Sequence, residues 1–157
     1  MHVLFVCTGN TCRSPMAECF FAAEIKQRAI AGIEVSSAGL AACVNTPMSD
    51  AAQTVLAENK LDGSKFRSTR FSAALADSCD LIVTMGDSHR EAICRALPEC
   101  RKKTIKLMDF TSGGDLPDPY GAPVSGYRQV FETMRPALIK LADMIENNEV
   151  FTNCQFF

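Results

Sequence analysis

Short apolar runs along the chain alternate with longer segments in which apolar residues recur every three or four positions. The short runs, rich in β-branched and aromatic residues, predict strands at residues 2–6, 33–37, 80–84 and 104–108. The longer segments predict helices at about residues 15–31, 50–60, 87–97 and 124–149, with a short helix at 73–76. Strands that alternate with helices indicate an α/β fold with a parallel sheet between helical layers. We therefore expect a single domain over residues 1–157, a three-layer sandwich.

Helix-capping and helix-breaking residues set the expected boundaries. Ser14 is placed as the N-cap of the first helix and Pro15 as its first residue, where a missing N–H costs nothing. Pro136 lies inside the apolar stripe of the last helix, so it predicts a kink or a break there. Residues 147–157 follow the last regular apolar position, and we expect them to form a frayed tail.

The loops that follow the strands are the expected place for a site. In parallel α/β sheets, ligands bind outside the carboxyl ends of the strands, where the strand order reverses. Three loops should meet there, at residues 7–14, 84–87 and 109–121. The third is long for an ordinary connection, which favours a functional loop. The first supplies a thiol and a guanidinium, and the third supplies carboxylates.

Composition and charge exclude several classes of protein. The 157 residues are 47% hydrophobic and 22% charged, which is typical of a globular domain with one buried core. No apolar run approaches the roughly 18 residues that span a bilayer, and no secretion signal precedes the first strand, so we expect a cytoplasmic protein without membrane contact. The net charge of −2 argues against a nucleic-acid partner. The short basic run at residues 101–103 is interpreted as a solvated loop.

The eight cysteines are interpreted as reduced thiols, because the chain is too long for a disulfide scaffold and lacks a secretion signal. Zinc is disfavoured, since no Cys-x2-Cys pair occurs and only His2 and His89 could supply imidazole. Both histidines are interpreted as structural, one at a terminus and one on a predicted helix. We expect no metal and no cofactor.

The loop after the first strand has the composition of a site for a cysteine nucleophile. Cys7 ends the strand, and Arg13 can offer a planar fork to two phosphate oxygens. Gly9 and Asn10 tolerate positive φ, so the loop can curl until its N–H groups point inward and bind an anion. The following helix adds its N-terminal dipole, and Ser14 could donate its hydroxyl to the Cys7 sulfur. These donors favour the thiolate, which attacks a phosphoryl group.

A leaving group needs a proton, which Asp118 could supply from the loop after the fourth strand. Pro119 fixes its backbone, although Asp-Pro is also common turn chemistry, and an ordinary turn aspartate is the alternative. Asp115 and Asp109 are weaker competitors for the same role.

Several segments together resemble the low-molecular-weight protein tyrosine phosphatase family, in order over residues 2–146. They are C-T-G-N-T-C-R-S-P-M-A-E at 7–18, S-A-G at 37–39, D-L-I-V-T-M at 80–85 and D-P-Y at 118–120. The resemblance implies a four-stranded parallel sheet in the order 2-1-3-4, no metal, and a phosphorylated protein as substrate. We expect the enzyme to be a monomer.

The resemblance also implies a two-step mechanism. Cys7 would become a phosphocysteine, Arg13 would bind the phosphoryl oxygens, and Asp118 would protonate the leaving group and then activate water. The residues implied in phosphate binding are Thr8, Gly9, Asn10, Thr11, Cys12, Arg13 and Ser14.

Two departures from the tyrosine-specific members bear on the substrate. Thr11 stands where many of those carry Ile or Leu. The bacterial branch that resembles protein arginine phosphatases also has a threonine there. The Thr11 hydroxyl could position a water or bond a guanidinium nitrogen, or Thr11 could be an isosteric filler. Leu40 opens a stretch without the aromatic wall of tyrosine-specific relatives, which leaves Tyr120 as the main wall beside Leu40. Phosphotyrosine and phosphoarginine both remain open as substrates.

Cys12 has two interpretations. It could trap an oxidised Cys7 as a disulfide, or it could be a small buried filler. Arsenate reductases of the same fold are the alternative function, but they carry a resolving cysteine after the third strand, where this chain has Gly86.

Overall fold

The computed structural model describes residues 1–149 and contains a four-stranded parallel sheet in the order β2-β1-β3-β4. The strands are β1 (His2–Cys7), β2 (Glu34–Gly39), β3 (Leu81–Thr84) and β4 (Thr104–Lys106). Neighbouring strands start in register, with His2 opposite Glu34 and Val3 opposite Leu81. The expected parallel sheet and its strand order are confirmed.

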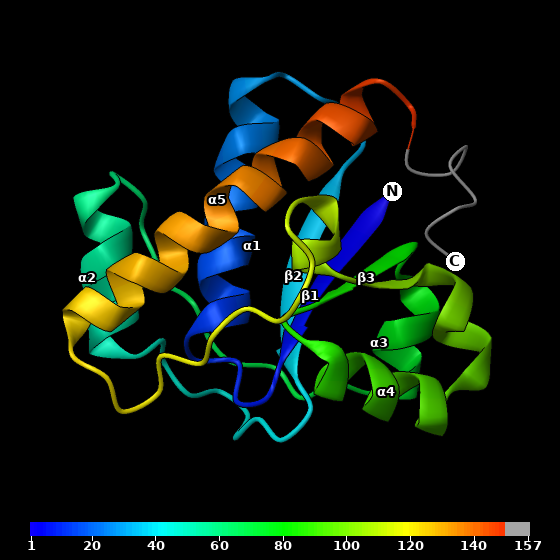
Figure 1. Cartoon of the computed structure of the whole chain (residues 1–157), viewed down its shortest axis with the longest axis horizontal. Coiled ribbons are helices and arrows are strands. Elements are labelled where there is room, and N and C mark those ends of the chain that lie inside the picture. The colour runs from blue at the N-terminus through cyan, green and yellow to red at the C-terminus, as the bar shows by residue number, and fades with distance from the viewer. Residues whose placement is uncertain (150–157) are drawn as a thin grey trace.

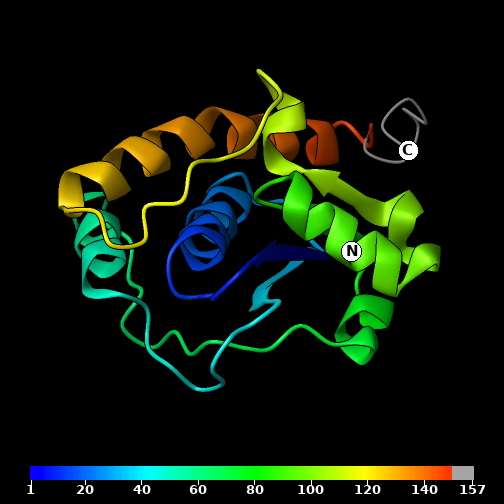
Figure 2. The same cartoon turned by 60° about the horizontal axis from the view of Figure 1, so that its bottom comes forward.

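Helices cover both faces of this sheet, as Figures 1 and 2 show. The α-helices are α1 (Arg13–Gln27), α2 (Asp50–Glu58), α3 (Ala73–Ser78), α4 (Asp87–Ala96) and α5 (Val124–Glu146). Two 3₁₀ helices flank β4, η1 (Pro98–Lys103) and η2 (Leu107–Phe110). In Figure 1, α1 and α5 lie together with α2 on one side, and α3 and α4 lie on the other.

The alternation of side chains along β1 explains why the core is divided in two. Val3 and Phe5 belong to the larger apolar cluster, which Phe21 of α1 joins. Leu4 and Val6 belong to the smaller cluster on the other face. Successive strand residues point to opposite faces, so a strand that is apolar at every position must lie between two layers. The central strand therefore places its last residue, Cys7, at the edge of a rigid framework.

The first helix differs from its predicted boundaries at both ends. It begins at Arg13, and Ser14 is not its cap, because the N-cap position falls on Cys12 and no side chain caps the helix. It ends at Gln27 in a Schellman turn, in which the N–H groups of Ala29 and Ile30 bond the carbonyls of Lys26 and Ile25. Ala29 has φ 55°, a conformation more often taken by glycine, so the local pattern did not signal this end.

The fourth strand and the last helix also depart from expectation. β4 ends at Lys106, because the next residues wind into η2 and thereby bury the adjacent Leu107 and Met108 together. Pro136 lies within α5, which continues through it, so the alternative of a helix break is wrong. The helix ends at Glu146, followed by a turn in which the Glu149 N–H bonds the Met144 carbonyl. Most of the predicted frayed tail, residues 150–157, lies outside the described residues.

The basic run at residues 101–103 is not simply solvated. Lys103 is half-buried, and its Nζ donates to the carbonyls of Ala76 at 2.7 Å and Cys79 at 2.8 Å. These carbonyls lie at the C-terminal end of α3, where unsatisfied acceptors and the helix dipole both favour a cation. Lys103 therefore ties α3 to η1.

Replacing Lys103 by methionine should lower the free energy of unfolding by about 1.5–3 kcal/mol, because two charge-assisted hydrogen bonds are lost. Urea denaturation of Lys103→Met measures the effect. Lys102→Met removes an exposed lysine next to it and should leave stability nearly unchanged. Equal stability of the two variants would contradict this role for Lys103.

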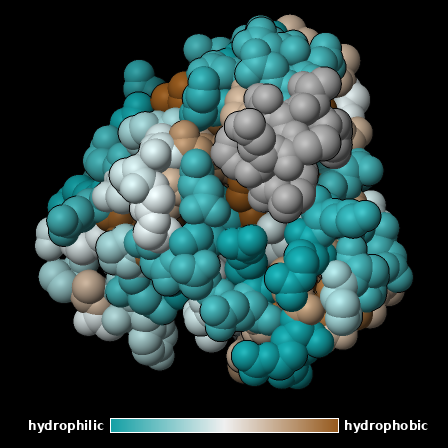
Figure 3. Space-filling model, turned by 45° about the vertical axis from the view of Figure 1, so that its right-hand side comes forward, coloured by the Kyte–Doolittle hydropathy of each residue, from teal (hydrophilic) through white to brown (hydrophobic). Residues whose placement is uncertain are grey.

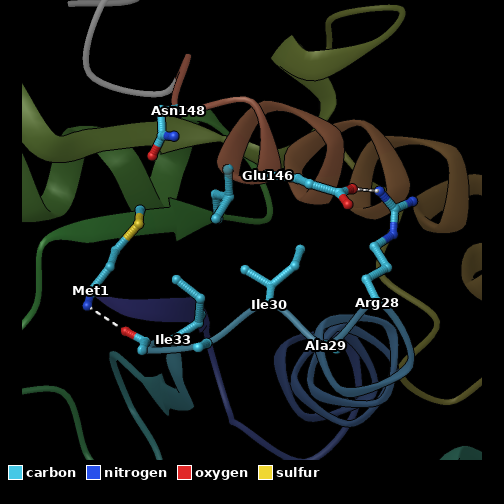
Figure 4. A pocket seen from close by; sticks show the side chains of 10 residues that line it. Met1, Arg28, Ala29, Ile30, Ile33, Glu146 and Asn148 are labelled. Carbon is cyan, nitrogen blue, oxygen red and sulfur yellow. Dashed lines mark hydrogen bonds and ion pairs between the residues drawn. The ribbon is translucent and has the colours of Figure 1, made fainter.

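Polar side chains cover most of the face shown in Figure 3, with small apolar areas between them. No helix among residues 1–149 is long and apolar enough to cross a membrane. A cavity of about 510 Å³ opens at the amino-terminal end of the sheet, between the α1–β2 turn and the end of α5. Figure 4 shows Met1 and Ile33 on one side of it, and Arg28 bonded to Glu146 at its rim. It lies at the end of the sheet opposite to the expected site.

Candidate active site

The loop between β1 and α1 owes its shape to Asn10. This residue has φ 54° and is fully buried. Its side-chain Nδ2 donates to Oγ of Ser14 at 2.9 Å and to Oγ of Ser37 at 2.8 Å, while its Oδ1 accepts from the Thr69 N–H at 2.8 Å. Both N–H groups of the side-chain amide and its oxygen therefore have hydrogen-bond partners, which hold the curled backbone of the loop in place.

Cys7 ends β1 with its side chain under the loop. The residue is 2% exposed, and its Sγ lies 3.0 Å from Oγ of Ser14. The backbone N–H of Asn10 donates to Sγ at 3.3 Å. The predicted contact between Ser14 and the sulfur is present, although Ser14 lies within the first turn of α1 and does not cap it. The Cys7 sulfur thus has the Ser14 hydroxyl and the Asn10 N–H beside it, close to the start of α1.

The end of β2 packs against the same loop, and only glycine permits it. A Cβ on Gly39 would lie 2.6 Å from the Thr8 carbonyl oxygen. This close approach lets the N–H of Leu40 bond the Cys7 carbonyl at 3.0 Å and the N–H of Ala41 bond the Thr8 carbonyl at 2.9 Å. The Ser-Ala-Gly segment therefore supports the loop from the neighbouring strand.

Arg13 and Asp118 meet beside the loop, although they are far apart in the sequence. One terminal nitrogen of Arg13 donates to Oδ2 of Asp118 at 2.6 Å, and the other donates to the Leu116 carbonyl at 3.4 Å. The Arg13 side chain is 8% exposed and the Asp118 side chain 50%. Oδ1 of Asp118 also accepts from the Tyr120 N–H at 3.2 Å. A buried cation thus faces a carboxylate that can reach solvent.

The other two acids of that loop are engaged elsewhere. Nζ of Lys106 lies 2.9 Å from Asp87, 3.6 Å from Asp115 and 3.8 Å from Asp109. The hydrogen bond to Asp87 raises the pKa of Lys106. Of the three candidate acids, Asp118 is therefore the one that contacts Arg13.

Cys7, Arg13 and Asp118 line a pocket of about 250 Å³ at the carboxyl end of β1. Its walls are residues 7–13 together with Asp118 and Tyr120, which is 82% exposed. Leu40 is not among the lining residues and packs against the smaller core cluster. Ser14 also lies outside the lining, beneath Cys7. The expected meeting of the three loops is observed, since Arg13 contacts Asp118 and the Leu116 N–H bonds the Met85 carbonyl at 2.9 Å.

His89, at the same edge of the sheet, makes a contact with the loop that the sequence did not predict. His89 of α4 is buried, and its Nε2 lies 2.9 Å from Oγ1 of Thr8 in the loop. Its position just after the loop that follows β3 was the available signal, because the carboxyl ends of parallel strands share one edge. His2 is structural as expected, with Nε2 2.6 Å from Oγ of Ser36.

Burial favours the neutral form of two other described thiols. Burial raises the pKa of Cys19 to about 12 and that of Cys79 to about 11. Cys12 is buried at the pocket wall, with Sγ 3.3 Å from the Tyr127 hydroxyl. Residues 1–149 contain no group of three or more His, Cys, Asp or Glu side chains placed to hold a metal ion.

The central strand of the parallel sheet carries a cysteine into an anion-binding loop, and an arginine stands at the start of the next helix. This arrangement is typical of cysteine-dependent phosphatases. Residues 2–150 match the family described as low molecular weight phosphotyrosine protein phosphatase, and the chain belongs to that family.

Relatives of two kinds share this sequence and fold. A protein-arginine-phosphatase of Geobacillus stearothermophilus is 35% identical over 150 residues, covering 94% of this chain and 98% of the relative. A low molecular weight protein tyrosine phosphatase from T. tengcongensis superposes with a TM-score of 0.86 at 37% identity, over 91% of this chain and 98% of the other. A YwlE arginine phosphatase variant with a phosphorylated active-site serine superposes with a TM-score of 0.90 at 31% identity, over 94% and 97%. The chain is accordingly a phosphatase of this type, a family that works through a phosphocysteine intermediate.

Proposed function

We propose that Cys7 is the nucleophile of this phosphatase and Asp118 its acid and base. In the first step the Cys7 thiolate attacks the phosphorus atom, and an S–P bond forms as the bond to the leaving group breaks. Asp118, protonated for this step, gives its proton to the leaving atom. In the second step Asp118 takes a proton from water, the hydroxide oxygen attacks phosphorus, and the S–P bond breaks to release phosphate.

Arg13 and the loop are proposed to stabilise the phosphoryl oxygens throughout. The guanidinium fork and the inward N–H groups between Thr8 and Ser14 suit the charge that spreads over these oxygens in the transition state. The observation that supports the assignment most directly is that Cys7, Arg13 and Asp118 line one small pocket, with Arg13 and Asp118 in contact.

We further propose that the substrate is phosphoarginine on proteins. The half-buried Thr11 lines the pocket, and its hydroxyl, 3.6 Å from the Cys12 sulfur, can bond a guanidinium nitrogen of the substrate. Residues 40–43, the segment that follows Gly39, contain no aromatic side chain. Two relatives, 35% and 33% identical, are named protein-arginine-phosphatases. Phosphotyrosine is the second candidate, because Tyr120 lines the pocket and could pack against its ring.

Thr11→Ile provides the decisive comparison between the two substrates. Wild type should hydrolyse a phosphoarginine peptide with a higher kcat/KM than the matched phosphotyrosine peptide. Loss of one hydrogen bond to a charged group should lower the phosphoarginine value by roughly tenfold or more, since such a bond contributes about 1.5–3 kcal/mol. Thr11→Ser retains the hydroxyl and serves as the matched control. If wild type and Thr11→Ile both prefer phosphotyrosine equally, the arginine assignment is wrong.

Cys12 is proposed to protect the nucleophile against oxidation. Peroxide converts Cys7 to a sulfenic acid, and the Cys12 thiol displaces water from it to form a disulfide. We expect peroxide-treated wild type to recover activity with dithiothreitol, whereas Cys12→Ser should lose activity irreversibly. Mass spectrometry of the treated wild type should show a linkage between Cys7 and Cys12, and its absence would leave Cys12 as a packing residue.

The arsenate reductase alternative finds no support in the site. A side chain at Gly86, the position of the resolving cysteine in those enzymes, would place its Cβ 2.9 Å from a carboxylate oxygen of Asp115. We also propose that residues 1–157 act as one monomeric domain in the cytoplasm, in keeping with the free cysteines among the described residues. Light scattering of the purified protein tests the monomer.

A further inference from the structure

A histidine that the proposed chemistry does not use lies behind the signature loop, the segment at residues 7–14 between β1 and α1. His89 is the third residue of α4, which begins directly after the loop that follows β3. Its Nε2 lies 2.9 Å from Oγ1 of Thr8, the residue bonded to Cys7. The histidine is 5% exposed, whereas Thr8 is exposed and lines the pocket. The imidazole therefore contacts, from inside the protein, a hydroxyl at the rim of the site.

The surroundings of His89 keep its ring neutral. Burial lowers the pKa of His89 below the ordinary value of 6.5, and the Arg13 guanidinium lowers it further. The carboxylates of Asp118 and Asp115 and the Gly86 backbone act in the opposite direction, and the net shift is downward. A neutral imidazole has one N–H and one lone pair, so Nε2 either donates to the Thr8 hydroxyl or accepts from it, according to the tautomer.

Packing alone does not explain an imidazole at this position. The second ring nitrogen, Nδ1, is buried without a hydrogen-bond partner among the described residues. The Gly86 backbone lies near enough to raise the pKa of the ring, but its geometry with Nδ1 is not that of a hydrogen bond. A buried polar atom without a partner is unfavourable, and an apolar side chain of similar volume would avoid that cost. The feature that distinguishes histidine from such a side chain here is the bond to Thr8.

We infer that His89 is a positioning residue for the phosphatase reaction, which acts by fixing Thr8 and through it the start of the signature loop. The Ala41 N–H holds the Thr8 carbonyl at 2.9 Å, and the bond from His89 holds the side chain of the same residue. A shift of Thr8 would move the Cys7 sulfur relative to the N–H groups that receive the phosphoryl oxygens. Misplacement of about 1 Å at a reacting centre can cost on the order of a hundredfold in rate. This inference rests on the proposed role of Cys7.

His89→Leu removes the contact with little change of volume and tests the inference with p-nitrophenyl phosphate. We expect kcat to fall by about tenfold to a hundredfold while KM changes little, because the loop is disturbed mainly in the transition state. In His89→Gln the side-chain amide can reach Thr8 from a similar position and should restore most of kcat. Glu91→Gln, on the exposed side of α4, should match wild type. Wild-type kcat in His89→Leu would overturn the inference.

A double-mutant cycle separates positioning through Thr8 from a general effect on stability. Thr8→Val should lower kcat about as much as His89→Leu, and the double variant should be no worse than either single one. If the losses multiply in the double variant, the inference is overturned. Wild-type kcat in Thr8→Val would overturn it even if His89→Leu does not fold. Cys7→Ser measured alongside tests the proposed nucleophile independently of these outcomes.

Discussion

Cys7→Ser should abolish turnover of p-nitrophenyl phosphate, with kcat falling at least about a thousandfold, towards the uncatalysed background. The serine hydroxyl has the same length and fits the same space, but it is protonated at neutral pH and is a far weaker nucleophile. The Ser14 hydroxyl and the Asn10 N–H remain in place around the substituted atom, so the anion-binding loop should persist. We expect the variant to bind inorganic phosphate, as measured by calorimetry, while steady-state hydrolysis is lost.

Cys43→Ser is the control, because it changes an exposed thiol that does not line the pocket. It should match the wild-type kcat. A variant at position 7 that still forms product in repeated turnovers would show that another group attacks the phosphorus atom, and the phosphocysteine assignment to Cys7 would then fail.

Asp118→Asn should lower kcat by about a hundredfold to ten-thousandfold, the usual contribution of a general acid. The loss should be greater for phenyl phosphate than for p-nitrophenyl phosphate, since a poorer leaving group depends more on a proton. The amide oxygen of asparagine can still accept from Arg13, so the pocket should keep its shape.

The same substitution should strengthen binding of inorganic phosphate. In the structure one terminal nitrogen of Arg13 donates to Asp118 at 2.6 Å, and a phosphate that takes both prongs of the fork must displace this carboxylate. The amide side chain of the variant would compete less well, because it carries no charge. Product inhibition constants measure the effect, and Asp115→Asn, which alters an acid facing Lys106, is the control. Weaker phosphate binding in Asp118→Asn would contradict this competition.

The sequence was most informative where the local pattern and the chemistry coincide. The strand that delivers Cys7, the positive φ of Asn10 and the parallel sheet all follow from residue types at short range. The residue pattern placed Asp118 ahead of Asp115 and Asp109, but only the family resemblance favoured a catalytic role over that of an ordinary turn aspartate. The structure adds the reason, which is that Lys106 engages Asp109 and Asp115 and leaves Asp118 to Arg13.

The contact of His89 and the position of Ser14 inside the first turn of α1 could not be predicted from local residue patterns. His89 meets Thr8 across 81 positions, and no local pattern distinguishes such a histidine from one on the surface of a helix. Ser14 has the residue type of a helix cap, but the Cys7 sulfur and the Asn10 amide compete for its hydroxyl and hold it inside the turn. Such competition between a local preference and a tertiary contact cannot be read from one segment.

During synthesis on a ribosome, Cys7 emerges long before its site can exist. The bonds that shape the loop come from Ser37 and Thr69, and the partner of Arg13 lies 105 residues further along the chain. A nascent chain shorter than this carries the thiol but not the folded loop around it. Only fully folded molecules of this enzyme can hydrolyse the substrate. The rate of turnover therefore measures how much of the newly made protein has matured.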